Sequence, residues 1–129
     1  RLRERRTLRQ GVASFNTLIS RYKAGATRRH LKWDLSNERA RQLFNGACFI
    51  CRVLPSRVCL PLGSNGGFMY NGIDRLDSHI GYIDGNVVSC CWDCNRMKSD
   101  LPLDDFLFLV SRIHENANDC SSAVSAVVV

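Results

Sequence analysis

Two short cysteine pairs constrain this chain more than any other feature of its sequence. Cys48 and Cys51 form one CxxC pair, Cys91 and Cys94 form a second, and 39 residues lie between the pairs. Each pair places two thiolates on one tight turn, and two such turns can surround a zinc ion tetrahedrally. Because four sulfur ligands leave no position for water, the sequence predicts a structural zinc ion and not a catalytic one.

The total cysteine count agrees with this prediction. Seven cysteines in 129 residues is an odd number, which fits poorly with the fully paired disulfides of a secreted protein. The sequence therefore favours an intracellular, reducing compartment. Redox-active or merely buried cysteines are the alternative for the two pairs. The other three, Cys59, Cys90 and Cys120, are expected to be core residues or free thiols.

Positive charge is concentrated in the first part of the chain. The net charge is +6, but residues 1–52 hold thirteen Lys and Arg against three acids, whereas residues 53–129 hold five against nine. Such crowding of like charges destabilises a compact state unless a polyanion neutralises it, so nucleic acid is the leading predicted partner. A solvated basic face is the alternative. No apolar run approaches the roughly 20 residues of a membrane span, so no membrane partner is expected.

Apolar periodicity and capping residues predict two helices near the N-terminus. Apolar side chains recur at helical spacing over residues 3–23, and Gly25 is expected to end that helix. Ser36 is a typical N-cap for a second, short helix that ends at Asn45-Gly46. An arginine-rich beginning is also typical of organelle-targeting segments, so an organellar location stays open as an alternative.

The later part of the chain predicts short strands and one more helix. Residues 68–76 and 86–89 are expected to form a hairpin with a long loop, and Pro102 to begin a helix that continues to about Asn116. No pattern predicts a structure for the last residues. We therefore expect three parts, a basic N-terminal helix or arm (1–32), a zinc-stapled domain (33–118) and a tail (119–129).

Between and after the cysteine pairs, several short motifs follow in a fixed order. Asn71-Gly72-Ile73-Asp74-Arg75-Leu76-Asp77 is followed by Gly81-Tyr82, by Asn86-Val87-Val88 and by a CxxCNxxK sequence that ends at Lys98. This combination resembles the HNH endonuclease family, specifically its zinc-stapled, phage-type branch, over roughly residues 21–116. The resemblance implies an α+β fold in which a small ββα-metal core carries the structural four-cysteine zinc, flanked by basic N-terminal helices and a C-terminal helix.

The resemblance also implies a second metal site, which would be the catalytic one. Asp74 and Asn95 stand where the family holds one divalent ion, and Asn86 stands where the central Asn orients the general base. Oxygen donors of this kind suit Mg²⁺ or Mn²⁺, and such an ion polarises a scissile phosphate and stabilises the leaving oxygen.

One position departs from the family pattern. Arg75 occupies the place of the general-base His, and a guanidinium stays protonated at any useful pH. His79 is a weak candidate to replace the missing base, and Asp77 is another, although an acid of ordinary pKa is a poor base. Arg75 would instead suit a phosphate contact. The residues predicted to bind nucleic acid are Arg3, Arg5, Arg6, Arg9, Arg28, Arg29, Lys32, Arg75, Arg96 and Lys98.

Three aromatic side chains, Trp33, Tyr82 and Trp92, are candidates for stacking on bases, although core packing is favoured for them. The leading hypothesis is a nucleic-acid-binding HNH-fold zinc protein derived from a metal-dependent endonuclease, with hydrolysis left open by Arg75. One alternative is an active HNH endonuclease that cuts DNA with a divalent metal. The other is a non-catalytic RNA-binding subunit of a ribonucleoprotein, such as an organellar ribosome.

Overall fold

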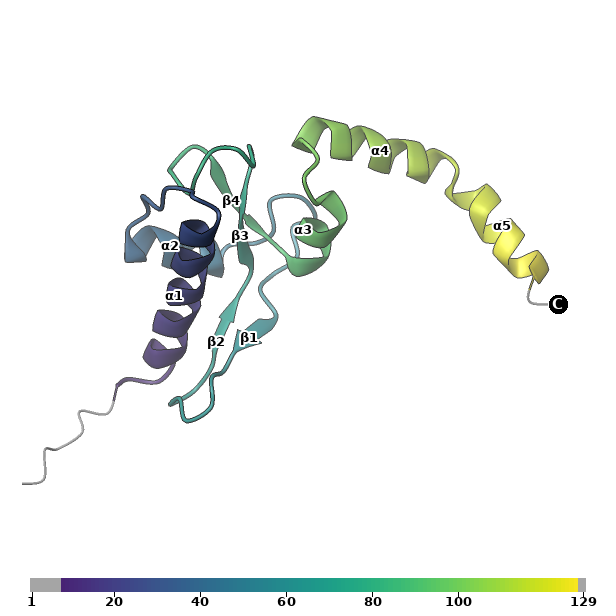
Figure 1. Ribbon diagram of the computed structural model, residues 1–129. Coiled ribbons are helices and arrows are strands. Elements are labelled where there is room, and N and C mark those ends of the chain that lie inside the picture. Colours follow the sequence, from purple (N-terminus) through teal and green to yellow (C-terminus); the bar gives the residue numbers. More distant parts are fainter. Residues whose placement is uncertain (1–7, 128–129) are drawn as a thin grey trace, which may run out of the picture. The chain divides into compact units, whose positions relative to one another are not determined.

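A computed structural model of the protein describes residues 8–127, and within that range it is a mixed α+β structure with five helices and two small antiparallel sheets (Figure 1). The α+β class predicted from the sequence is thereby confirmed. The chain divides into two compact units, one up to Met97 and one from Lys98 onward. None of the helices in the described range is long and apolar enough to cross a lipid bilayer.

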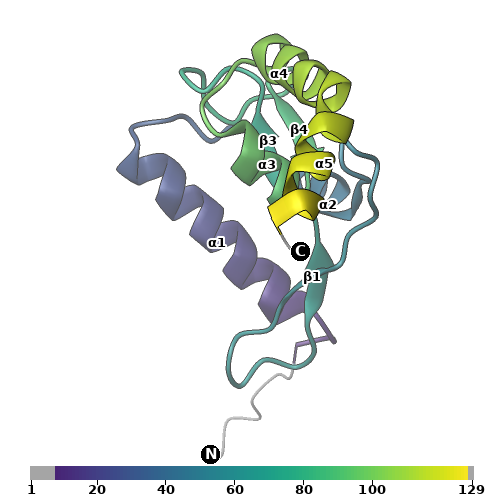
Figure 2. The same ribbon diagram turned by 90° about the vertical axis from the view of Figure 1, so that its right-hand side faces the viewer.

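The first unit is built from two helices, two hairpins and a third helix. Its elements are α1 (Val12–Arg28), α2 (Asn37–Asn45), β1 (Arg57–Cys59), β2 (Phe68–Tyr70), β3 (Gly72–Arg75), β4 (Val87–Cys90) and α3 (Trp92–Lys98), which ends at the boundary between the units. β1 pairs with β2, and β3 pairs with β4 so that Asp74 lies opposite Val88. Helix α1 contacts β1 and β2, and α2 packs against β2, β3 and β4 (Figure 1, Figure 2).

Capping and packing explain where the first two helices begin and end. The Ser36 hydroxyl accepts the Arg39 backbone N–H at 3.0 Å, which confirms the predicted N-cap of α2. Helix α1 differs from the expected 3–23, because it starts at Val12 and continues through Gly25 to Arg28. Ala26, in the same turn, is only 1% exposed, and burial in the core outweighs the cost of about 1 kcal/mol for a mid-helix glycine.

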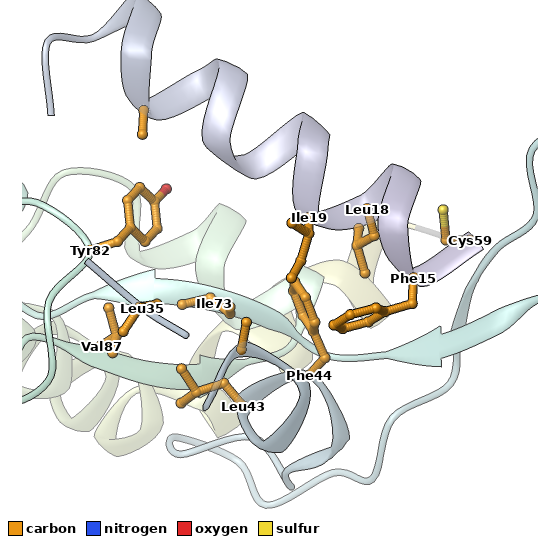
Figure 3. Close-up of a cluster of buried hydrophobic side chains, with 12 residues drawn as sticks. Phe15, Leu18, Ile19, Leu35, Leu43, Phe44, Cys59, Ile73, Tyr82 and Val87 are labelled. Carbon is orange, nitrogen blue, oxygen red and sulfur yellow. The ribbon is translucent and has the colours of Figure 1, made fainter. Parts of the chain in front are cut away.

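The core of the first unit joins α1 to α2 and the strands. Phe44 is fully buried and lies beside Phe15 of α1 (Figure 3). Its ring also makes edge-on contacts with Tyr22 of α1 and with Phe68 and Tyr70 of β2. Residues 12–28 are therefore part of the folded unit. They belong to the segment 1–32 that the sequence predicted as a basic N-terminal helix or arm.

The strands and the C-terminal region differ in part from the sequence expectations. The strand expected over residues 68–76 is divided at Asn71 into β2 and β3, each with its own partner strand, and β1 was not predicted. Asn71 separates them because its backbone N–H donates to the Phe44 carbonyl at 2.8 Å and not to a neighbouring strand. In the second unit, α4 (Leu103–Glu115) matches the expected helix, and α5 (Ala117–Val127) occupies most of the expected tail.

Candidate metal centre and the adjoining hairpin

The four cysteines of the two CxxC pairs converge on one point. The Sγ atoms of Cys48, Cys51, Cys91 and Cys94 all lie within 4.8 Å of one another, and those of Cys51 and Cys91 are 3.7 Å apart. A tetrahedral zinc ion with Zn–S bonds of about 2.3 Å requires sulfurs about 3.8 Å apart. The cluster can therefore hold a metal such as zinc, as the spacing of the pairs predicted.

Backbone hydrogen bonds shape the first cysteine turn. The Cys48 N–H donates to the Val53 carbonyl and the Arg52 N–H donates to the Cys48 carbonyl, both at 2.9 Å. Arg52 has a φ of 67°, in the left-handed region that reverses the chain after the second cysteine. The buried Asn71 side chain spans the whole turn, because its amide group donates to the carbonyls of Gly46 and Val53.

Strand β4 brings the second cysteine turn to the first. The Phe49 N–H donates to the Ser89 carbonyl at 2.8 Å, which fixes the first turn to β4. Cys91 follows β4 directly, α3 begins at the next residue, and the Cys94 N–H donates to the Cys91 sulfur at 3.4 Å. Asn71 was not predicted to support this centre, since an asparagine between two strands has no sequence signature of its own.

Burial and backbone amides act in opposite directions on the cysteine thiols. Burial raises the pKa of Cys48, but N–H groups of Cys51, Cys91 and Ile50 directed at its sulfur outweigh burial and lower its pKa to about 6. Burial raises the pKa of Cys91 and of Cys94, and at Cys94 the neighbouring thiols add to the increase. Cys48 is therefore more easily deprotonated than Cys91 or Cys94.

Metal binding should therefore weaken as the pH falls. Zinc binds thiolates, so each ion must displace the protons held by Cys91 and Cys94, whereas Cys48 contributes none well above its pKa of about 6. Displacing the protons of Cys91 and Cys94 alone corresponds to a gain in affinity of at least about 100-fold for each pH unit of increase. Competition with a zinc chelator at several pH values between about 6.5 and 8 measures this slope. An affinity independent of pH would contradict the prediction.

The loop between β3 and β4 is closed by one buried amide side chain. Asn86 is 7% exposed, and its Nδ2 donates to the carbonyls of Asp77, Ile80 and Gly81 while its Oδ1 accepts the Asp77 N–H at 2.9 Å. Asn86 therefore holds the loop of residues 77–81 in one conformation. Its predicted role in orienting a general base stays a prediction.

Arg75, at the position of the expected general base, and His79, its candidate substitute, lie in different surroundings. The Arg75 guanidinium donates to the carbonyls of Ser78 and Ile80 and lies 5.4 Å from the centre of the Tyr82 ring, so it closes the same loop from the β3 side. The His79 side chain is 93% exposed, with Nδ1 3.4 Å from a carboxylate oxygen of Asp77. His79 is accessible to solvent, and its role as a substitute base stays a prediction.

The predicted second metal pair comes from two different elements. Asp74 lies on β3 opposite Val88, and Asn95 lies on α3, exposed, one residue after the last cysteine. Asp74 is close enough to Cys90 for its charge to raise the pKa of that thiol, although burial of Cys90 is the larger cause. Binding of Mg²⁺ or Mn²⁺ by Asp74 and Asn95 stays a prediction.

The predicted nucleic-acid-binding residues are mostly accessible. Arg3, Arg5 and Arg6 lie outside the described residues, and Arg9, Arg28, Arg29, Lys32 and Arg96 are exposed. Two of the predicted residues are not exposed: Arg75 is half-buried, and Lys98 is 4% exposed, with its Nζ donating to the Leu101 carbonyl at 3.5 Å.

The three candidate stacking residues divide into two groups. The Trp33 and Tyr82 rings pack against each other and against Tyr22, and Tyr82 is 4% exposed. These contacts agree with the core packing favoured for both residues. Trp92, by contrast, is 50% exposed. Only the tertiary contacts separate the two groups, because the residue types alone are equally suited to stacking and to packing.

Comparisons with known proteins identify a viral relative. No family model matches the chain, and no solved structure matches it. The chain is similar to "Uncharacterized protein R423" of Acanthamoeba polyphaga mimivirus, with 32% identity over 108 residues that cover 81% of this chain and 18% of the mimivirus protein. The chain thus spans less than a fifth of the length of that relative.

Proposed function

We propose that this chain is a nucleic-acid-binding module of the zinc-stapled HNH type, with zinc in the cluster formed by Cys48, Cys51, Cys91 and Cys94. The order of elements supports the proposal, since a β3–β4 hairpin with a loop closed by Asn86 leads directly into the helix that follows Cys91. A segment made of such short strands needs a staple of this kind, and the convergent cysteines are suited to provide it.

The observation that carries the proposal is the position of the basic end of α1. The Arg29 guanidinium donates to the Tyr82 hydroxyl at 3.0 Å, and the backbone of Lys32 pairs with the backbone of Tyr82. Arg29 and Lys32 thereby lie beside Tyr82, Arg28 directly precedes Arg29 in the chain, and the Arg75 guanidinium is 5.4 Å from the centre of the Tyr82 ring. Cations gathered beside an HNH-type hairpin are suited to hold the phosphates of a nucleic acid.

The proposal is for binding without hydrolysis. General-base catalysis is typically worth about 10²–10⁴-fold, and Arg75 stands where that base is expected. Its guanidinium is engaged by two loop carbonyls and cannot accept a proton from water. We therefore expect no cleavage of nucleic acid above background in Mg²⁺ or Mn²⁺.

Substitution of the basic cluster tests the proposal. Deleting residues 1–32 would remove core side chains of α1, so the cleaner change is the exposed pair Arg28→Ala and Lys32→Ala. The double variant should bind duplex DNA and structured RNA more weakly. On duplex DNA, the slope of log affinity against log salt should fall by about 0.9 for each phosphate that the variant no longer neutralises. Fluorescence anisotropy at several salt concentrations measures both quantities.

Arg112→Ala is the matched control, because it removes an exposed arginine from α4 in the second unit. It should leave the slope unchanged. A salt slope that does not change in the Arg28→Ala, Lys32→Ala protein would argue against this surface as the phosphate site. Cleavage of plasmid DNA by the wild-type protein, abolished by Asn95→Ala, would replace the binding proposal with an active endonuclease.

A further inference from the structure

We infer that a cleft beside the second cysteine turn binds one unpaired nucleobase of a single-stranded nucleic acid, an inference that rests on the proposed function. The cleft lies within the first unit and has a volume of about 380 Å³. Its lining combines aromatic and polar side chains from several elements, among them Tyr22, Tyr70 and Trp92, together with Ser56, Arg57 and Asn95.

Trp92 provides the stacking surface. Its side chain remains 50% exposed although it follows a buried cysteine, and the guanidinium groups of Arg57 and Arg96 lie 5.6 Å and 4.8 Å from the centre of its ring system. Tyr70 is held in the cleft wall by its edge-on contact with Phe44, at 5.9 Å between ring centres. Aromatic faces with neighbouring arginines are the groups on which proteins stack unpaired bases.

The polar lining and the volume of the cleft fit a nucleotide better than an apolar ligand. The Ser56 hydroxyl and the Asn95 amide supply donors and acceptors for the edge of a base, and the Asp93 carboxylate can accept from an exocyclic amino group. Arg57 places a positive charge at the same cleft, where a backbone phosphate would lie. A volume near the lower end of ligand pockets suits a single nucleotide.

A paired base cannot enter this cleft without leaving its stack, which costs a few kcal/mol. The cleft should therefore favour single strands, whereas the basic cluster at the end of α1 should hold phosphates of either form. This difference allows the two sites to be tested separately in the same protein.

The test is Trp92→Ala in the full, zinc-loaded chain, with labelled single-stranded RNA and DNA oligonucleotides and the same strands annealed into duplexes. Because stacking is worth about 1–3 kcal/mol per base, single-strand affinity should fall by about 5- to 150-fold. Duplex affinity should change by less than about twofold, as phosphate contacts dominate there. Anisotropy titrations give all four affinities.

Phe49→Ala is the matched control. Phe49 is an exposed aromatic residue in the first cysteine turn, with the Arg52 guanidinium 5.8 Å from its ring centre, and it lies outside the cleft lining. This variant should leave every affinity within about twofold of wild type. Trp92→Leu should lose single-strand binding like Trp92→Ala, and Trp92→Tyr should restore most of it, which separates stacking from apolar bulk and from folding.

Each outcome bears on one of the two proposals. Equal losses on single strands and duplexes, or no loss on either, would overturn the cleft while nucleic-acid binding by the wild type still stands. A wild-type protein that binds neither form would overturn the proposed function and this inference with it. Selective loss on single strands supports the cleft, with the RNA and DNA arms showing which polymer it prefers.

Discussion

Cys48→Ser is expected to release the metal and to abolish the cooperative unfolding transition of the first unit. Cys48 is fully buried in the four-cysteine cluster, and backbone N–H groups stabilise its thiolate. Structural zinc in small domains contributes about 10–16 kcal/mol of apparent binding free energy at pH 7, as much as the whole stability of most domains. Elemental analysis should find one zinc ion per wild-type chain and none in the variant.

Cys120→Ser is the matched control for this change. Cys120 is an exposed free cysteine on α5, outside the cluster, so its substitution should leave both zinc content and thermal unfolding unchanged. A chelator should reproduce the effect of Cys48→Ser on the wild-type protein. If wild-type protein carries no tightly bound metal, or if Cys48→Ser unfolds at the wild-type temperature, the cluster is not a structural metal site.

Phe44→Ala is expected to cost about 3–5 kcal/mol of the free energy of unfolding in the metal-loaded protein. Phe44 is fully buried, and its ring contacts join α1 to β2, so truncation leaves a cavity where two helices and a sheet meet. Urea unfolding followed by tryptophan fluorescence measures the loss. Trp33 and Trp92 both lie in the first unit, so the signal reports that unit.

Phe108→Ala is the matched control, because it removes a phenylalanine side chain from the surface of α4, where Phe108 is 70% exposed. It should change the free energy of unfolding by less than about 0.5 kcal/mol. A loss from Phe44→Ala no larger than this would show that α1 is not packed into the core. In that case α1 would form an arm that does not contribute to the stability of the first unit.

Local patterns in the sequence predicted the features that depend on neighbouring residues. The CxxC spacing identified all four members of the cysteine cluster, because two thiols on one turn are held together by the turn itself. Ser36 and Gly46 marked the ends of α2, since capping is a contact between residues three apart. Short strands were likewise predicted from local patterns in the regions that hold β3 and β4, whereas the α+β class came from the family resemblance.

Local sequence patterns could not predict the contacts between residues that are far apart in the chain. The basic segment around Arg29 proved to be part of the core unit because α1 packs against Phe44, and a charge count carries no information about that packing. Trp33 and Trp92 are the same residue type, yet Trp33 packs against the rings of Tyr22 and Tyr82, whereas Trp92 is half exposed with two arginines near its ring.

The cysteine cluster could be predicted from the sequence, whereas the cleft beside it could not. Residue type and spacing along the chain were enough to predict which four cysteines could hold a metal, because a thiolate pair keeps that chemistry in any fold that brings the two turns together. The cleft around Trp92 required the tertiary structure, since Tyr22, Arg57, Tyr70 and Asn95 are far apart in sequence and meet only when the strands and α3 are assembled. Burial and proximity are properties of the assembled chain and are absent from any short segment of it.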